Sequence, residues 1–365
     1  MSSEGRVIRR PLEKTSCNAC GYAFHSQPIS PHDRDIFYDE TYDLGLRDAG
    51  ADRRRAQDYA RHIEAFLARH ADGPRPGLSI VEFGCGTGAL LDCMMERWKA
   101  ARLLGVEPAA RLAQVARARV GRNIEVRQGF AESGRTAGES FDLCVSVNVV
   151  EHALDPVSFL AACAASVTDD GAIVTICPDG DHPDSELLFR DHISSFSATA
   201  FALVAAQAGL RLIASAPLEG QQSGFRIFLL RSDRNPVVER DRSRGQLSHL
   251  REGYLKGWRE LEQATLSSLG DREFAIFGTG EYADLLHAYC PGVTDRAHFY
   301  VVDTPGQRER DGREVIATDE FLSRGRMIAL AAIHPRNWST FRRRFEAAAD
   351  RIVHPYQFCS LRSQL

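Results

Sequence analysis

The chain has 365 residues, of which 44% are hydrophobic and 26% charged, and its formal net charge is −4. This length accommodates two compact domains and an appendage, and the nearly balanced charge gives no overall basis for binding nucleic acid or a membrane surface. No apolar run reaches bilayer-spanning length, and residues 1–14 lack the apolar core of a signal peptide. We expect a cytoplasmic protein with a small-molecule partner; its oligomeric state stays open.

Near the N-terminus, Cys17 and Cys20 form a C-x2-C pair, which is the spacing of a zinc knuckle. A tetrahedral zinc site needs two more ligands, and the nearest candidates are His25 and His32. The alternative is a turn with two free thiols. Most of the other cysteines lie in apolar segments, which predicts buried thiols rather than disulfides.

An aromatic segment follows, and it contains Tyr38 and Tyr42. Residues 56–69 then repeat apolar side chains at helical spacing, which predicts an amphipathic helix. The two tyrosines are candidates for a lid that contacts substrate, or alternatively they pack the appendage onto the core.

The stretch 79–108 contains the strongest signal in the chain. An apolar strand ends at Glu82 and is followed by a glycine-rich turn, residues 84–88, and by a helix with one apolar face. A second strand ends at Glu107, where a carboxylate accepts hydrogen bonds from both ribose hydroxyls of a nucleoside. Strand, glycine turn and helix form the first unit of a doubly wound α/β sheet.

Two more strands follow, and both end at candidate ligand-binding residues. Phe130 and Ala131 come shortly after the strand at 124–126, and Asn148 directly follows the strand at 141–147. In open α/β sheets the carboxyl ends of strands are the edge at which ligands bind.

The acid before the glycine loop and the G-x-G-x-G spacing resemble motif I of class I S-adenosylmethionine (SAM) methyltransferases. The resemblance implies that SAM is the cofactor and that strands near 172–177, 210–214 and 225–230 complete a seven-stranded sheet with an antiparallel edge. The implied cofactor-binding residues are Glu82, Gly84, Cys85, Gly86, Gly88, Glu107, Pro108, Phe130, Ala131, Asn148 and Val149.

An insertion at residues 178–196 contains the catalytic candidates. Its sequence LLFRDHISSFS resembles the segment of sugar C-methyltransferases in which an acid–histidine pair precedes a Tyr/Phe-Phe-Ser motif. The order of C-x2-C segment, aromatic segment, SAM core and C-terminal unit is similar to that family too. We predict that His192 is the general base and that Asp191 orients it, with His152 as a second candidate. The alternative is that His192 only caps a helix or bonds backbone.

The C-terminal part predicts a second, smaller Rossmann-like domain. The pattern G-x-G-x-x-A at residues 278–283 precedes Asp303, and His334 follows a third strand. The glycine motif and Asp303 are typical of an NAD fingerprint. Because the unit is short, we instead expect a domain that assists substrate binding, with His334 as a candidate contact. We expect four divisions of the chain: an appendage (1–77), the methyltransferase domain (78–233), a connecting helix (234–270) and the C-terminal Rossmann-like domain (271–365).

From these patterns we expect a SAM-dependent methyltransferase that acts on a sugar or sugar nucleotide in a biosynthetic pathway. Three alternatives stay open: an O- or N-methyltransferase of another small metabolite, an NAD-dependent oxidoreductase that uses the C-terminal glycine motif, and a non-catalytic SAM-binding scaffold.

Overall fold

The computed structural model describes residues 1–8, 11–27, 30–36, 38, 42, 49–121, 124–134, 136–238 and 245–365. The chain divides into two compact units. The large unit contains Leu12–Leu187 and Asp191–Ser248, and the small unit contains Met1–Pro11, Leu188–Arg190 and His249–Leu365. The sequence predicts a separate appendage at residues 1–77. In the structure, most of these residues belong to the same compact unit as the glycine-rich loop.

A seven-stranded sheet forms the centre of the large unit. Its strands, in spatial order, are β5 (Ile124–Gln128), β4 (Arg102–Glu107), β3 (Ser79–Phe83), β6 (Phe141–Val147), β7 (Val167–Pro178), β10 (Phe225–Ser232) and β9 (Leu210–Pro217). Neighbours from β5 to β7 are parallel, and β10 is antiparallel to both β7 and β9. The predicted α/β sheet with an antiparallel edge is confirmed. Strand order reverses at β3, where such sheets bind ligands.

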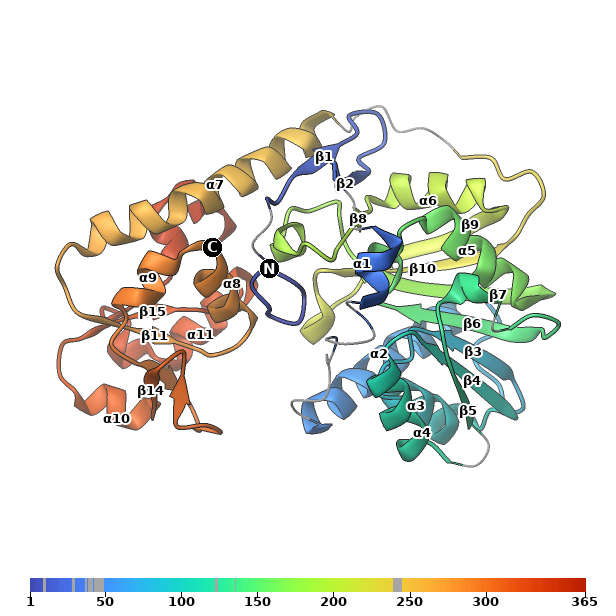
Figure 1. Ribbon diagram of the computed structural model, residues 1–365, viewed down its shortest axis with the longest axis horizontal. Coiled ribbons are helices and arrows are strands. Elements are labelled where there is room, and N and C mark those ends of the chain that lie inside the picture. The colour runs from blue at the N-terminus through green and yellow to red at the C-terminus, as the bar shows by residue number, and fades with distance from the viewer. Residues whose placement is uncertain are drawn as a thin grey trace. The chain divides into compact units, whose positions relative to one another are not determined.

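Helices cover both faces of this sheet (Figure 1). The helices that pack on one face are α2 (Ala49–His70), α3 (Ala89–Trp98) and α4 (Ala110–Arg119), and those on the other are α5 (Pro156–Ala165) and α6 (Ala198–Gln207). The side chains of Asp155 and Ser197 cap α5 and α6, as their sequence positions predict. A further short helix is α1 (Pro31–Ile36).

A second, three-stranded sheet of the large unit joins segments far apart in the sequence. It consists of β1 (Lys14–Ser16), β2 (Ala23–His25) and β8 (Ser194–Ser195). Strands β1 and β2 form the hairpin that contains the C-x2-C turn, and β2 pairs antiparallel with β8. The N-terminal hairpin thereby contacts the insertion immediately after His192.

The small unit contains a six-stranded sheet of its own, and its parallel core confirms a second α/β domain. The strands, in spatial order, are β13 (Glu309–Arg310), β14 (Arg313–Ala317), β12 (Tyr300–Val302), β11 (Phe274–Phe277), β15 (Ile328–Ala331) and β16 (Ile352–Val353). The remaining helices are α7 (Gly245–Leu269), α8 (Glu281–Tyr289), α9 (Pro291–Arg296), α10 (Thr318–Ser323) and α11 (Trp338–Arg344). Among the described residues of both units, no helix has the length and apolarity that crossing a membrane requires.

Candidate functional site

A cavity of about 840 Å³, counting the space at its open mouth, lies in the large unit where β3, β4 and β6 end. Many of the predicted site residues line it: Tyr38, Tyr42, Glu82, Gly84, Cys85, Gly86, Glu107, Pro108, Asn148, Val149 and His152. Side chains from four separate segments therefore meet in one cavity.

Glu107 ends β4 and is 3% exposed. Its two carboxylate oxygens accept hydrogen bonds from the backbone N–H groups of Gly86 (2.8 Å) and Ala109 (2.9 Å). Burial raises the pKa of this carboxyl to about 7, although both hydrogen bonds oppose the rise. A carboxylate accepts about four hydrogen bonds, so capacity remains for two ligand hydroxyls.

Two further polar side chains of the cavity have buried atoms without a hydrogen-bond partner. These atoms are Oε2 of Glu82 and Oδ1 of Asn148. Burial, followed by the charge of Glu107, raises the pKa of Glu82 well above its usual value. The Nδ2 of Asn148 donates to the Tyr59 hydroxyl at 3.1 Å, which holds the amide in place. Because unpaired buried acceptors are costly, these atoms indicate a polar ligand with hydrogen-bond donors.

The glycines of the loop have different functions. A Cβ on Gly84 would lie 2.3 Å from Val149, and one on Gly88 would lie 2.9 Å from Val120, so these two glycines permit close packing within the protein. Gly88 is not among the residues that line the cavity. Gly86 has φ +53° and no protein atom within 4 Å of the position of a Cβ, so its open side faces the cavity.

We expect the Gly86→Ala variant to fold but to bind SAM at least about tenfold more weakly, because its methyl group enters the space left for the ligand. The left-handed backbone adds a stability loss of about 1 kcal/mol. The Gly134→Ala variant is the matched control, since Gly134 has φ +69° and equally open surroundings outside the cavity. Thermal unfolding and calorimetric titration measure both effects, and parental SAM affinity in Gly86→Ala would contradict this placement.

Sequence reasoning missed the part of the cavity wall that α2 supplies. Asp52 is 8% exposed, and its Oδ2 accepts hydrogen bonds from Thr87 (2.5 Å) and Arg119 (2.9 Å). Arg55 and Tyr59 of the same helix face also line the cavity. The helix starts earlier than the predicted residue 56. The sequence did contain a signal: Asp52, Arg55 and Tyr59 are three, four and seven residues apart, a spacing that places their side chains on one face of a helix.

The aromatic residues predicted near the cofactor lie close together. The ring of Tyr38 is 5.1 Å from that of Tyr42 and 5.7 Å from that of Phe130. The guanidinium of Arg34 covers Phe130 at 3.7 Å from the ring centre. Phe130 and Ala131 are not among the lining residues of the cavity, whereas both tyrosines are.

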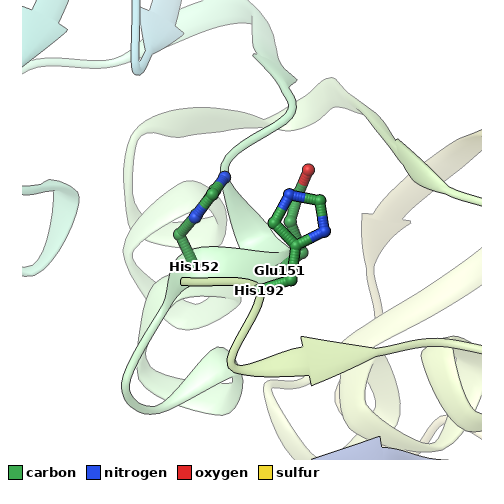
Figure 2. Close-up of side chains that lie close together, drawn as sticks. All are labelled: Glu151, His152 and His192. Carbon is green, nitrogen blue, oxygen red and sulfur yellow. The ribbon is translucent and has the colours of Figure 1, made fainter. Parts of the chain in front are cut away.

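His152 is buried at the wall of the cavity, just after β6 (Figure 2). Its Nδ1 lies 2.9 Å from the carbonyl oxygen of Asp191, so Nδ1 donates and Nε2 keeps its lone pair. Burial and the neighbouring His192 lower the pKa of His152 to about 4, which keeps this imidazole neutral at pH 7.

His192 lies beside His152, with ring centres 4.8 Å apart, but it is not among the lining residues. Its Nδ1 is 3.8 Å from Oε2 of Glu186, so Glu186 rather than the predicted Asp191 is the carboxylate beside this ring. Burial alone would lower the pKa of His192, but Glu186 and the charges of Asp191 and Glu151 raise it above its ordinary value. Asp191 instead supports His152.

The N-terminal hairpin holds the backbone around His192. Lys14 Nζ donates to the His192 carbonyl oxygen at 2.5 Å, and the His25 N–H donates to that of Ile193 at 3.1 Å. Hydrogen bonds from the Ala19 and Cys20 backbone lower the pKa of Cys17, which favours the thiolate that zinc prefers. Among the described residues, neither cysteine belongs to a group of three possible metal ligands.

In the small unit, the features of the predicted NAD fingerprint contact protein groups. Asp303 pairs with Arg344 at 2.7 Å and accepts a hydrogen bond from Thr318 at 3.2 Å. Arg310 donates to the carbonyl oxygen of Thr279 within the glycine turn. His334 follows β15, and its ring packs edge-on against Tyr282 at 5.1 Å.

Sequence comparisons agree with the geometry of the large unit. Residues 51–215 match a family described as methyltransferase domain. The chain is 33% identical over 123 residues to a ubiquinone biosynthesis O-methyltransferase of Cereibacter sphaeroides, which covers 32% of this chain and 49% of that protein. It is 38% identical over 104 residues to the enzyme with the same name from Methylobacterium sp., with 27% and 41% coverage. The chain thus spans about half the length of the first of these relatives.

Among solved structures, the mitomycin 7-O-methyltransferase MmcR matches 56% of this chain and 58% of its own, with 20% sequence identity and a TM-score of 0.43. The family match, the strand order and the glycine loop with Glu107 at the switch point agree with one another. Residues 51–215, somewhat less than half of the chain, therefore match a methyltransferase domain of the class I, SAM-dependent kind.

Proposed function

We propose that the protein transfers the methyl group of SAM to a sugar or sugar-nucleotide-like small molecule, and that His192 accepts the proton of the methyl acceptor. The observation that carries this proposal is the single cavity in which Glu107, the open side of Gly86 and His152 meet. Glu107 suits the two ribose hydroxyls, and the unpaired acceptors Glu82 and Asn148 suit ligand donors deeper in the cavity.

SAM, when bound, supplies a methyl group made strongly electrophilic by the positive sulfur. The protein has to align the acceptor with this group and to remove the acceptor's proton. Gly86 and Glu107 would hold the nucleoside end of SAM. His152 lines the cavity, and His192 lies beside it with a pKa that the surrounding carboxylates raise.

A sugar-like acceptor is supported by the order of the segments in the chain. The C-x2-C hairpin, the aromatic segment, the SAM core and the C-terminal α/β unit follow one another as in sugar C-methyltransferases. We further propose that Cys17 and Cys20 bind a structural zinc ion, which would stiffen the hairpin that holds the His192 backbone, and that His334 contributes to substrate recognition.

A second candidate is O-methylation of another small metabolite. The observation that favours it is the identity of 33–38% with ubiquinone biosynthesis O-methyltransferases over the SAM core. The two candidates share cofactor and cavity and differ only in the acceptor.

The experiment that tests the function combines binding with transfer. Calorimetry should detect SAM and S-adenosylhomocysteine binding at one molecule per chain, and radiolabelled methyl should pass from SAM to a nucleoside-diphosphate sugar. Transfer only to phenolic or other hydroxyl acceptors would select the second candidate. NAD binding without SAM binding would replace both with an oxidoreductase, whereas SAM binding without transfer to any acceptor class would indicate a scaffold.

A further inference from the structure

Three buried side chains, one carboxylate and two imidazoles, meet beside the cavity. Glu151, His152 and His192 each offer one ligand atom, and these atoms lie within 4.8 Å of one another. Figure 2 shows a nitrogen of each imidazole and the carboxylate of Glu151 turned toward the region between the three side chains. Two of the residues are neighbours just after β6, and the third comes from the insertion after β7. Folding therefore assembles a group that the sequence separates.

The carboxylate of Glu151 has no hydrogen-bond partner among the described residues, although His192 lies near enough to offer an opposite charge when it is protonated. The residue is 1% exposed, and both of its carboxylate oxygens are buried without a hydrogen-bond partner. An isolated buried carboxylate is strongly destabilising unless a cation or a set of donors compensates it. This is an observation independent of the clustering, and it indicates a positively charged ligand.

In both histidines the nitrogen next to the chain faces an oxygen acceptor, but only that of His152 lies within hydrogen-bond distance. Nδ1 of His152 donates to the carbonyl oxygen of Asp191, and Nδ1 of His192 lies 3.8 Å from Glu186. Glu186 is itself fixed, because its Oε1 accepts a hydrogen bond from Ser195 at 2.6 Å. Metal-binding histidines characteristically have such a carbonyl or carboxylate on the second nitrogen, which orients the ring and leaves Nε2 for the metal.

We propose that Glu151, His152 and His192 bind one divalent transition-metal cation through one carboxylate oxygen and the two Nε2 atoms. Two imidazoles and one carboxylate suit Zn²⁺, Mn²⁺, Fe²⁺ and Co²⁺ better than Mg²⁺ or Ca²⁺, which prefer oxygen ligands alone. Ligands of one such ion lie about 3–3.5 Å apart, given metal–ligand bonds of about 2.1 Å. Side-chain rotations that move the ligand atoms by about an ångström would close the site.

This proposal rests on the proposed function, because a cation held by His152 would lie at the cavity wall where the acceptor arrives. A Lewis acid at that position binds an acceptor oxygen and lowers its pKa, so that less basic groups suffice to take the proton. In the cation-bound protein His192 is a ligand rather than a base. Turnover that depends on the cation would indicate that His192 acts as a ligand, and turnover without the cation would indicate that it acts as a base.

The test uses Co²⁺ as a spectroscopic probe on the full chain after removal of metal with a chelator. We expect one Co²⁺ per chain with visible absorption bands of nitrogen and oxygen ligands; a near-ultraviolet thiolate band would instead report the Cys17–Cys20 pair. The Glu151→Gln variant should bind Co²⁺ at least about 100-fold more weakly. His152→Gln is a second variant, and His182→Gln, whose side chain is 83% exposed on the same insertion, is the control.

Co²⁺ affinity that is unchanged in a folded Glu151→Gln protein overturns the site, and so does a parent protein that binds Co²⁺ only with the thiolate band. Metal-free protein with full turnover on a working acceptor overturns the participation of the cation in transfer. SAM affinity, measured on the same samples, keeps the two proposals apart: a parent protein that binds Co²⁺ at the predicted site but not SAM contradicts only the proposed function.

Discussion

The His192→Gln variant is expected to turn over about 10²- to 10⁴-fold more slowly than the parent, with nearly unchanged SAM affinity. The cofactor contacts come from β3, β4 and β6, whereas His192 belongs to the insertion and faces His152 and Glu186. Glutamine preserves an N–H group for Glu186, so the buried carboxylate keeps a partner. The loss should appear in kcat, measured at a saturating concentration of the acceptor, because the variant neither positions the bound acceptor nor removes its proton.

The control for this variant is His182→Gln, in the same insertion but exposed. It should retain parental turnover, which shows that the insertion tolerates the change of residue type. Near-parental turnover in a folded His192→Gln protein would contradict both the base and the ligand role. His152, which lines the cavity, would then be the residue to replace.

The Glu107→Ala variant is expected to weaken SAM binding by about 30- to 1000-fold, or roughly 2–4 kcal/mol, because two charge-assisted hydrogen bonds to the ribose are lost. The change also leaves the N–H groups of Gly86 and Ala109 without their acceptor. Folding must therefore be checked by circular dichroism before calorimetry. Parental affinity in a folded variant would place the ribose elsewhere.

SAM affinity of the parent should also depend on pH through this residue. Because burial raises the pKa of Glu107 to about 7 in the free protein, the carboxyl is protonated below that pH. A ligand that needs the carboxylate must then displace the proton, so Kd rises by up to about tenfold per pH unit as the pH falls below about 7 and is flat above it. The Glu107→Gln variant should show no such slope between pH 6 and 8, as measured by calorimetry.

The fold was largely predictable because local patterns and tertiary packing agree. Short apolar runs, most of them buried on both faces, and the turns that follow them define β3 to β7, and the strand order agrees with the crossover rules for such sheets. Three strands of the small unit, β13, β14 and β16, were missed. β13 and β16 have only two residues each, so neither produces a periodic signal, and the polar and charged residues at the start of β14 mask its apolar end.

The candidate site was predictable only where ligand-binding residues follow strands. Glu107 and Asn148 stand at strand ends, which makes them visible in the sequence. Asp52 lies in the stretch ADRRRAQD, which reads as a solvated face because its burial depends on partners 35 and 67 residues away. Glu186 precedes His192 by six residues across an irregular segment, so no spacing rule pairs them.

The contact of α2 with the glycine loop determines the smallest fragment of this protein that can fold and bind the cofactor. One face of α2, including Ile63 and Phe66, forms part of the same apolar core as Ile80 and Leu91. A recombinant fragment that began at residue 78 would expose that core to water and would lose the anchor that Asp52 gives to Thr87. A soluble cofactor-binding fragment of this chain consequently has to begin upstream of residue 49, far ahead of the motif that identifies it.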